Sequence, residues 1–223
     1  FAPGTRWEYS DAGPNWLAEC LTLAYGRDLD DWMYERVFTP LGIQRSDLGW
    51  RENAYRPATL EGIPRREFGS GIHADVDARA RIGYLMLREG HWNGQRILSA
   101  DYVRRAVDTP AGHDQLPVLH PETYGSAAKH YGLLWWNNVD AARPEVPRDA
   151  YWSWGLYDSL ILVIPSLDLV AARAGRGWKR AEDAGHYDVL APFFEPIVQA
   201  VRRRPGDRRP DTGHGRQASP PET

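Results

Sequence analysis

The sequence predicts an α+β fold from the order in which its hydrophobic patterns change along the chain. Four segments with helical spacing come first, an antiparallel hairpin follows at 159–173, and a last helical segment comes after it. Helices that precede and follow an antiparallel sheet are typical of the α+β class. The chain has 223 residues, of which 42% are hydrophobic, and is therefore long enough to build a substantial core. We expect the folded region to cover 1–201.

The first helical segment, 15–25, carries its apolar residues on one side. Spacings of three and four residues place them on a single helix face, so we expect this face to lie against the core. Gly26 follows directly, and glycine readily adopts the left-handed conformation that ends a helix. The apolar face consists of Trp16, Leu17, Cys20, Leu21 and Ala24.

Three polar residues predict where the next helices begin. Asp28, Asp75 and Ser99 each come just before a segment with helical spacing. Their side-chain oxygens can accept a hydrogen bond from a free N–H group of the first turn. The helices predicted in this way cover 29–38, 76–87 and 100–107.

Continuous apolar runs predict the strands. Residues 159–165 are rich in Leu, Ile and Val, and a turn at 166–168 leads into 169–173. This pattern predicts an antiparallel hairpin, and a strand that is apolar at every position is buried on both faces. We expect a further strand at 131–136, after a loop over 110–130.

The C-terminal region divides into a helix and a tail. A helix is expected from 187 to 201, kinked by Pro192 and Pro196, which interrupt helical hydrogen bonding. No large apolar residue occurs after Val201. We therefore expect 202–223 to be a disordered tail rich in Arg, Pro and Gly.

Composition excludes several function classes. A net charge of −3 provides no positive field for a nucleic-acid partner. No run of about 18 apolar residues exists, which excludes a membrane-spanning helix in this sequence. The single cysteine, Cys20, excludes a disulfide framework. The N-terminus has neither an initiator Met nor a signal pattern, so we expect the chain to begin inside a longer domain.

Several linked motifs resemble one protein family. In chain order they are PGTRWEYSDAG at 3–13, VFTPLGI at 37–43, FGSGI at 68–72, WNGQRILS at 92–99 and YGLLWW at 131–136. Together they resemble the serine β-lactamases and penicillin-binding-protein-like hydrolases, particularly the class C β-lactamase-related esterases. The resemblance implies a transpeptidase-like antiparallel sheet flanked by helices and incomplete at its N-terminus. Residues 1–201 would form the C-terminal portion of that domain.

The resemblance also implies a chemistry, namely cleavage of a small-molecule ester or amide through an acyl-enzyme, without metal or cofactor. The family uses a Ser-x-x-Lys motif, a Tyr-x-Asn motif, and a Lys/His-Ser/Thr-Gly motif on a strand beside the substrate. Tyr9 matches the second motif as a proton relay, with Asp11 where the family most often has Asn. The third motif matches loosely near 153–158. The substrate-binding residues implied are Asp11, Trp154, Gly155, Tyr157 and Ser159.

The nucleophile motif is not found before Tyr9. The chain contains one Ser-x-x-Lys, at 126–129, but it follows the Tyr motif and lies in a segment expected to be a loop. Short motifs often match by chance, and we interpret this match as a coincidence. We expect the nucleophile upstream of Phe1, and we expect this chain alone to be inactive.

Three alternatives remain open from the residues alone. Tyr9 could simply be a packed side chain beside a helix N-cap formed by Ser10 or Asp11. The tryptophans at 135, 136, 152 and 154 could be core residues, or they could line a cleft. In that second case the chain could be a non-catalytic relative that binds a sugar or a peptide.

Overall fold

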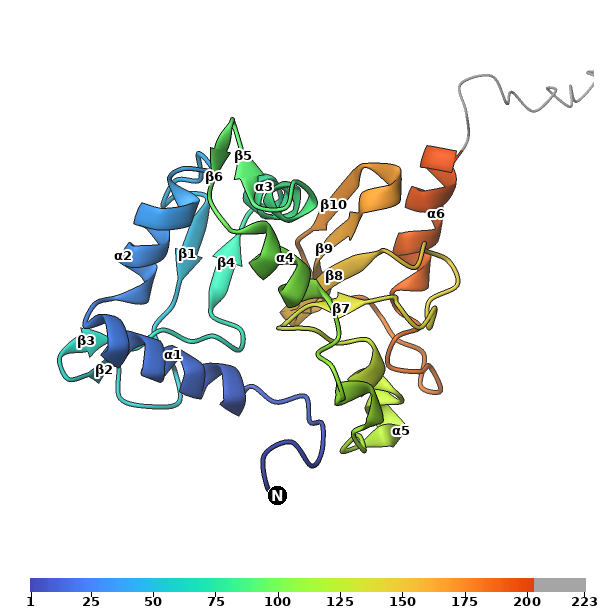
Figure 1. The fold of residues 1–223 in the computed structure, drawn as a ribbon, viewed down its shortest axis with the longest axis horizontal. Coiled ribbons are helices and arrows are strands. Elements are labelled where there is room, and N and C mark those ends of the chain that lie inside the picture. The colour runs from blue at the N-terminus through green and yellow to red at the C-terminus, as the bar shows by residue number, and fades with distance from the viewer. Residues whose placement is uncertain (203–223) are drawn as a thin grey trace, which may run out of the picture.

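Residues 1–202, which the computed structural model describes, form an α+β fold of two parts (Figure 1). The N-terminal helices and small sheets make up one part, and a four-stranded antiparallel sheet dominates the other. The helices are α1 (Ala12–Tyr25), α2 (Leu29–Met33), α3 (Val76–Leu87), α4 (Ala100–Val107), α5 (Pro121–Tyr124) and α6 (Ala191–Arg202). None of the helices in this described part combines the length and apolar character needed to cross a bilayer.

The main sheet has the strand order β10-β9-β8-β7, and all neighbouring strands are antiparallel. The predicted hairpin is confirmed as β9 and β10, with Leu169 opposite Ile164. The strands of this sheet are β7 (Trp136–Asn137), β8 (Tyr151–Gly155), β9 (Ser159–Ile164) and β10 (Leu169–Arg173). Three two-stranded sheets pair β1 (Leu48–Trp50) with β4 (Ile72–Ala74), β2 (Thr59–Leu60) with β3 (Ile63–Pro64), and β5 (His91–Trp92) with β6 (Gln95–Arg96).

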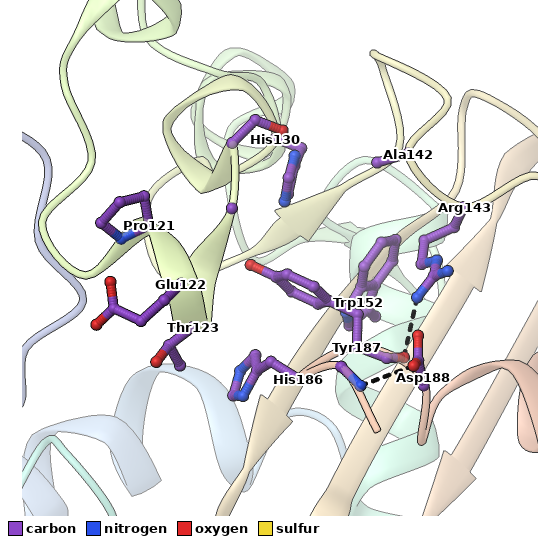
Figure 2. A pocket seen from close by; sticks show the side chains of 13 residues that line it. Pro121, Glu122, Thr123, His130, Ala142, Arg143, Trp152, His186, Tyr187 and Asp188 are labelled. Atoms are coloured by element: carbon purple, nitrogen blue, oxygen red, sulfur yellow. Dashed lines mark hydrogen bonds between the residues drawn. The ribbon is translucent and has the colours of Figure 1, made fainter. Parts of the chain in front are cut away.

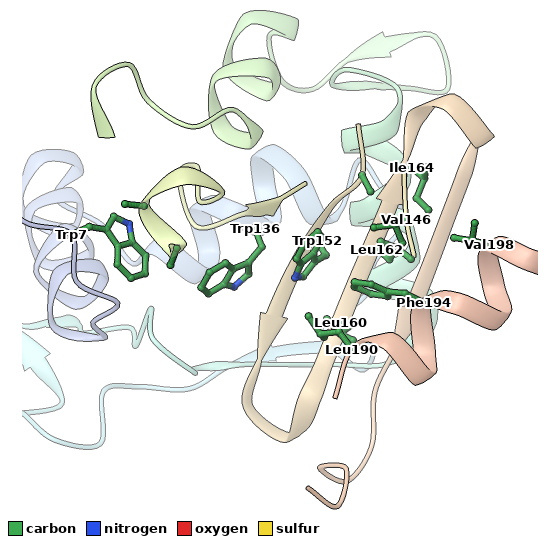
Figure 3. Packing of buried hydrophobic residues seen from close by; sticks show 13 residues of the cluster. Trp7, Trp136, Val146, Trp152, Leu160, Leu162, Ile164, Leu190, Phe194 and Val198 are labelled. Carbon is green, nitrogen blue, oxygen red and sulfur yellow. The ribbon is translucent and has the colours of Figure 1, made fainter. Parts of the chain in front are cut away.

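Strand β9 is buried on both faces, as its sequence predicts. Side chains alternate between the two faces of a strand, so neighbouring residues enter different cores. Leu160 and Leu162 pack with Phe194 of α6 on one face (Figure 3). Ile161 and Val163 pack against α3 and α4 on the other face. The sheet is therefore the middle layer between α6 and the α3–α4 pair.

The predicted helix signals at Gly26, Asp28, Asp75 and Ser99 are confirmed. Gly26 has φ +62° after the last residue of α1. The Asp75 carboxylate accepts from the Ala78 N–H at 2.7 Å, and Asp28 and Ser99 accept in the same way from their first turns. These local hydrogen bonds fix where α2, α3 and α4 begin.

The prediction for the buried face of α1 is wrong. Trp16 and Leu17 are 57% and 49% exposed, and the buried residues are Asn15, Ala18, Glu19 and Thr22. Asn15 and Glu19 have partners in the Arg-rich segment that follows α2, while Thr22 donates to the Ala18 carbonyl within α1. Asn15 accepts from the Phe68 N–H at 2.9 Å, and Glu19 pairs with Arg56 at 2.5 Å. Polar groups can be buried when they are hydrogen-bonded. The spacing of apolar residues in the sequence carries no information about such hydrogen bonds, so it did not predict this face.

The predicted strand at 131–136 is wrong for most of its length. Only Trp136 belongs to β7, and Leu134 has a positive φ of 66°, which interrupts an extended strand. The segment 110–130 is mostly loop, as expected, but it includes the short helix α5.

Two helices also differ from their predicted bounds. The segment 29–38 contains α2 followed by a π-helical turn, Tyr34–Phe38. The last helix begins at Ala191, not at 187, so Pro192 falls in its first turn, where no N–H group is required. The predicted tail lies outside the described residues, apart from Arg202, which ends α6.

Gly83 allows α3 to approach the sheet closely. A Cβ placed on Gly83 would lie 2.6 Å from Cγ2 of Ile161 and 2.7 Å from Cγ1 of Val170. Both neighbours are β-branched residues on β9 and β10, and such side chains have little freedom to rotate away. The helix can therefore lie at this distance only because position 83 has no side chain.

We expect Gly83→Ala to destabilise the protein by about 1–3 kcal/mol, because the added methyl overpacks the interface. Urea unfolding measures this change. Gly13→Ala is the matched control, since position 13 also lies in a helix and a Cβ there meets no atom within 4 Å. Equal stabilities for the two variants would show that α3 does not depend on this contact.

Candidate functional site

A cavity of about 340 Å³ lies between the N-terminus of α1, the loop before β4, and the facing ends of β8 and β9. Its wall contains five of the six site residues that the sequence predicts: Tyr9, Asp11, Trp154, Gly155 and Ser159. The first two lie about 150 residues away in sequence from the other three, so folding brings them together. The cavity also contains Phe68, Gly69 and Arg79, which the sequence analysis did not select.

The sixth predicted residue, Tyr157, lines a neighbouring cavity of about 340 Å³. It is 63% exposed. The two cavities share part of their walls and form two lobes of one site. We call the one containing Tyr9 the first lobe and the one containing Tyr157 the second lobe. The shared residues are Phe68, Gly69, Arg79, Gly155 and Ser159.

Tyr9 lies half-buried in an aromatic cluster at the edge of the first lobe. Its ring stacks on Trp136, with centroids 5.6 Å apart and ring planes at 21°. Burial, followed by the nearby Asp11 and Tyr124, raises the pKa of the Tyr9 phenol. In this surrounding Tyr9 is protonated at neutral pH.

The neighbours Ser10 and Asp11 have different roles at the start of α1. Ser10 Oγ accepts from the Ala12 N–H at 3.1 Å, while the Asp11 carboxylate makes no capping hydrogen bond. The Asp11 side chain packs instead against Gly69, where a Cβ would lie 2.8 Å from the carboxyl carbon. Asp11 is thus available to the first lobe, whereas the capping role belongs to Ser10.

The wall formed by the Gly-rich loop is held in place by α1. The Asn15 side-chain oxygen accepts from the Phe68 N–H at 2.9 Å and from the Asn53 amide at 3.4 Å. Asn15 is buried, so these hydrogen bonds are shielded from water. The position of Phe68 and Gly69 therefore depends on the same helix that begins beside Tyr9.

The opposite wall ends in a turn with unusual backbone geometry. Between β8 and β9, Tyr157 and Asp158 have φ values of 59° and 54°. Consecutive non-glycine residues in this region are strained and persist only where surrounding contacts hold them. Arg173 supplies such contacts, because its guanidinium donates to the carbonyls of Tyr157 and Asp158 at 3.0 and 2.7 Å.

The Asp158 carboxylate is the second anchor of this turn, and the sequence analysis did not predict it. It is buried and accepts from Trp154 Nε1 at 3.0 Å, the Trp178 N–H at 2.8 Å and Arg180 at 2.7 Å. Burial by itself would raise the pKa of Asp158, but the hydrogen bonds from these three donors outweigh it and lower the pKa. The only sequence signal was one acid directly before an apolar strand.

The tryptophans are mainly core residues. Trp136 and Trp152 are 2% and 1% exposed and belong to one buried cluster, in which Trp152 contacts Phe194 of α6 and Trp136 lies on the side of Trp7 (Figure 3). Trp135 packs on Tyr151 on the opposite face of the sheet. Only Trp154 lines the first lobe, so a cleft lined by all four tryptophans is not what the chain forms.

A separate cavity of about 300 Å³ contains the Ser-x-x-Lys serine, Ser126. His130, His186 and Tyr187 project into this cavity (Figure 2). The Tyr187 hydroxyl donates to the Tyr124 carbonyl at 3.0 Å. Ser126 precedes a 3₁₀ turn, Ala127–Lys129, and does not line the lobe that contains Tyr9. The interpretation of this motif as a coincidence stays a prediction.

Comparison with known proteins decides the family. The sequence model of the Beta-lactamase family matches residues 1–192. The chain belongs to the beta-lactamase family. No curated protein sequence matches it.

Solved structures of the beta-lactamase fold resemble this family member over most of its length. A beta-lactamase from Mycobacterium bovis shares 20% identity with a TM-score of 0.63, covering 90% of this chain and 65% of that one. Simvastatin synthase from Aspergillus terreus shares 18% identity with a TM-score of 0.58, covering 89% and 55%. These likenesses confirm the α+β fold of the family. The chain spans between 46% and 65% of the length of the structures it matches first.

We expect Asp158→Asn to lower the free energy of unfolding by about 2 kcal/mol at pH 7, since it weakens hydrogen bonds to a charged group. A carboxyl whose pKa is lowered by folding stabilises the fold at pH values above its unfolded-state pKa of about 3.9. This stabilisation is lost as the pH falls through the lower pKa of the folded state. The difference in the free energy of unfolding between the variant and wild type should therefore shrink as the pH falls from about 5 to about 3, roughly one pH unit on either side of the unfolded-state value.

Urea unfolding at pH 7 and pH 3 measures the Asp158 effect. Asp168→Asn is the matched control, because Asp168 lies in the turn at the other end of β9 and forms an exposed ion pair with Arg88 at 2.8 Å. Exposed ion pairs contribute little to stability, so we expect the control to change the free energy of unfolding by no more than about 0.5 kcal/mol. A loss for Asp158→Asn that is equal at both pH values would contradict the charge-based account.

Proposed function

We propose that this chain is the C-terminal portion of a serine hydrolase that cleaves an ester or amide through an acyl-enzyme. The observation that supports this most is the first lobe, where Tyr9 and Asp11 face Trp154, Gly155 and Ser159. Membership of the beta-lactamase family adds support. The alternative is a non-catalytic relative that binds a sugar or a peptide. It has less support, because only one of the four tryptophans, Trp154, lines the cavity.

In the proposed reaction, a serine from sequence before Phe1 attacks the carbonyl carbon of the substrate. Its oxygen forms the new bond to carbon, and the bond to the leaving alcohol or amine breaks. A lysine of the same Ser-x-x-Lys motif and Tyr9 move the proton from the serine to the leaving group. Water then attacks the acyl-enzyme, which releases the acid and restores the serine proton.

Tyr9 suits a relay better than a permanent base. Its raised pKa keeps the phenol protonated, and a hydroxyl both donates and accepts. The phenol oxygen can accept the serine proton while its own proton passes to the leaving group. No net charge then accumulates on a half-buried oxygen, which avoids the cost of burying an anion.

The carbonyl oxygen becomes negatively charged when the serine attacks. In our proposal the backbone N–H groups around Gly155 and the start of β9 donate to this oxygen. Gly155 leaves room for it, because a Cβ there would meet no atom within 4 Å. The Asp158 and Arg173 contacts hold this turn before substrate binds, so little reorganisation is required.

Tyr9→Phe tests the relay in a chain that includes an upstream Ser-x-x-Lys. The substitution keeps the ring packing and removes the hydroxyl, which makes no hydrogen bond within residues 1–202. General acid–base groups contribute about 10²–10⁴-fold, so we expect kcat to fall by that order with nearly unchanged stability. Tyr102→Phe, at an exposed tyrosine of α4, is the control. Full turnover by Tyr9→Phe would make Tyr9 a packing residue.

Asp11→Asn tests substrate class in the same extended chain. An ionised Asp only accepts hydrogen bonds, whereas Asn can also donate to a substrate carbonyl. We expect esterase activity to stay within about tenfold, which corresponds to about 1.4 kcal/mol, and any activity on β-lactams to rise. The ratio of kcat/KM for an ester and a β-lactam measures this effect. A collapse of esterase activity would show that the carboxylate itself is required.

The 223-residue chain by itself should be inert toward acyl substrates. Incubation with a fluorophosphonate, followed by intact-mass measurement, should show no covalent adduct. Ser126 is the residue to watch, because it is the only Ser-x-x-Lys serine in the sequence. Stoichiometric labelling of Ser126 would place the nucleophile inside this chain and overturn the proposal of an upstream serine.

A further inference from the structure

Arg79 is the one cation whose side chain lines both lobes of the site. It lies in the first turn of α3, and Gly83 follows it by four residues, so both lie on the helix face that meets the sheet. The Arg79 Nε donates to the Ala74 carbonyl at 3.1 Å. This hydrogen bond fixes the start of the side chain and leaves the two terminal nitrogens of the guanidinium for another acceptor.

No carboxylate within residues 1–202 pairs with this guanidinium. Eleven other arginines in that range each lie within 4.0 Å of an acidic oxygen, but Arg79 does not. Its side chain is half-buried. Burial lowers the pKa of Arg79, and the nearby Asp75 offsets this only in part. Within residues 1–202, a partly desolvated positive charge thus lies beside a cavity without a carboxylate partner.

The two lobes differ in charge. The first lobe contains the acids Glu8 and Asp11 close to Tyr9. The wall of the second lobe contains no acid; its polar side chains are Arg79 and His73 together with the hydroxyls of Ser70, Tyr157 and Ser159. Arg79 lines both lobes, but only in the first lobe do acids oppose its charge, so an anion is attracted more strongly to the second lobe.

We propose that the second lobe binds a carboxylate of the substrate through Arg79. This inference rests on the proposed function, because it identifies the substrate as an ester or amide that also carries a carboxylate. The planar guanidinium presents two parallel donors, which match the two oxygens of a carboxylate. The acyl carbonyl then lies between the lobes, near Gly155 and Ser159, with its leaving group toward Tyr9.

The test measures binding to the 223-residue chain, which requires no nucleophile. Hexanoate and hexanamide have the same length and differ in charge. Proton NMR titration should show hexanoate binding at least about tenfold more tightly than hexanamide, since a charge-assisted pair contributes more than a neutral hydrogen bond. The Arg79 Nε–H resonance of the wild-type chain should shift with hexanoate, whereas that of Arg105 should not.

Variants then assign the effect to position 79. Arg79→Gln should weaken hexanoate binding at least about tenfold, and Arg79→Lys should restore part of it because the charge returns without the paired donors. Arg105→Gln is the matched control, because Arg105 is exposed on α4 and lies outside both lobes. The wild-type NMR shift remains informative if a variant fails to fold.

The possible outcomes separate this inference from the proposed function. Equal affinity for hexanoate and hexanamide, or unchanged hexanoate binding by folded Arg79→Gln, overturns the carboxylate site. Inorganic phosphate that binds Arg79 as tightly as hexanoate also overturns it in favour of a phosphate site. Selective hexanoate binding together with no turnover by an extended chain supports the carboxylate site and refutes only the hydrolase proposal.

Discussion

The contact between α3 and the sheet at Gly83 determines how the two parts of the chain meet. Helix α3 contributes to two cores: Ala78 and Leu85 pack with the N-terminal part, and Met86 packs with the sheet. Because position 83 has no side chain, the helix lies directly on β9 and β10. The separation between the Gly-rich loop and the end of β8 follows from this contact, and both lobes of the site occupy that separation. Arg79 points toward the lobes because it is one turn before Gly83 on the same face.

Paired charges shape the N-terminal wall of the site. Its segment between β1 and β4 has few apolar residues. Ion pairs of Arg66 with Asp28 and of Arg56 with Glu19 connect this segment to the helices, and Arg51 pairs with Glu67 inside it. Glu19 and Glu67 are buried, so their pairs depend on both partners being present. The same network explains why α1 presents a polar face to the protein. Its Asn15 reaches Phe68, and the helix that positions Tyr9 therefore also positions the opposite loop.

Sequence alone predicted the features that depend on neighbouring residues. The caps at Asp28, Asp75 and Ser99 are local, and the β9–β10 hairpin follows from one apolar run and its turn. The buried face of α1 could not be predicted, because its polar residues are stabilised by partners about 40 to 50 positions away. Asp158 and Arg79 were missed for a related reason. In the sequence, Asp158 and Arg79 resemble any other charged residues. Only the folded chain shows that Asp158 accepts from three donors and that Arg79 has no acidic partner among residues 1–202.

The predicted site residues came from motif resemblance, and the fold gives them a physical order. Tyr9 and the acids Glu8 and Asp11 lie in one lobe, Arg79 connects the two, and the Gly155 turn lies between them. A ligand with one anionic end can enter such a site productively in only one orientation, because the reverse would place its charge beside two carboxylates. In the proposed reaction, orientation by charge would place the reacting carbonyl near the strained turn without requiring tight contacts along the whole ligand. Under that proposal, rigidity at Asp158 and Gly83, rather than an extensive apolar pocket, would align the substrate with Tyr9.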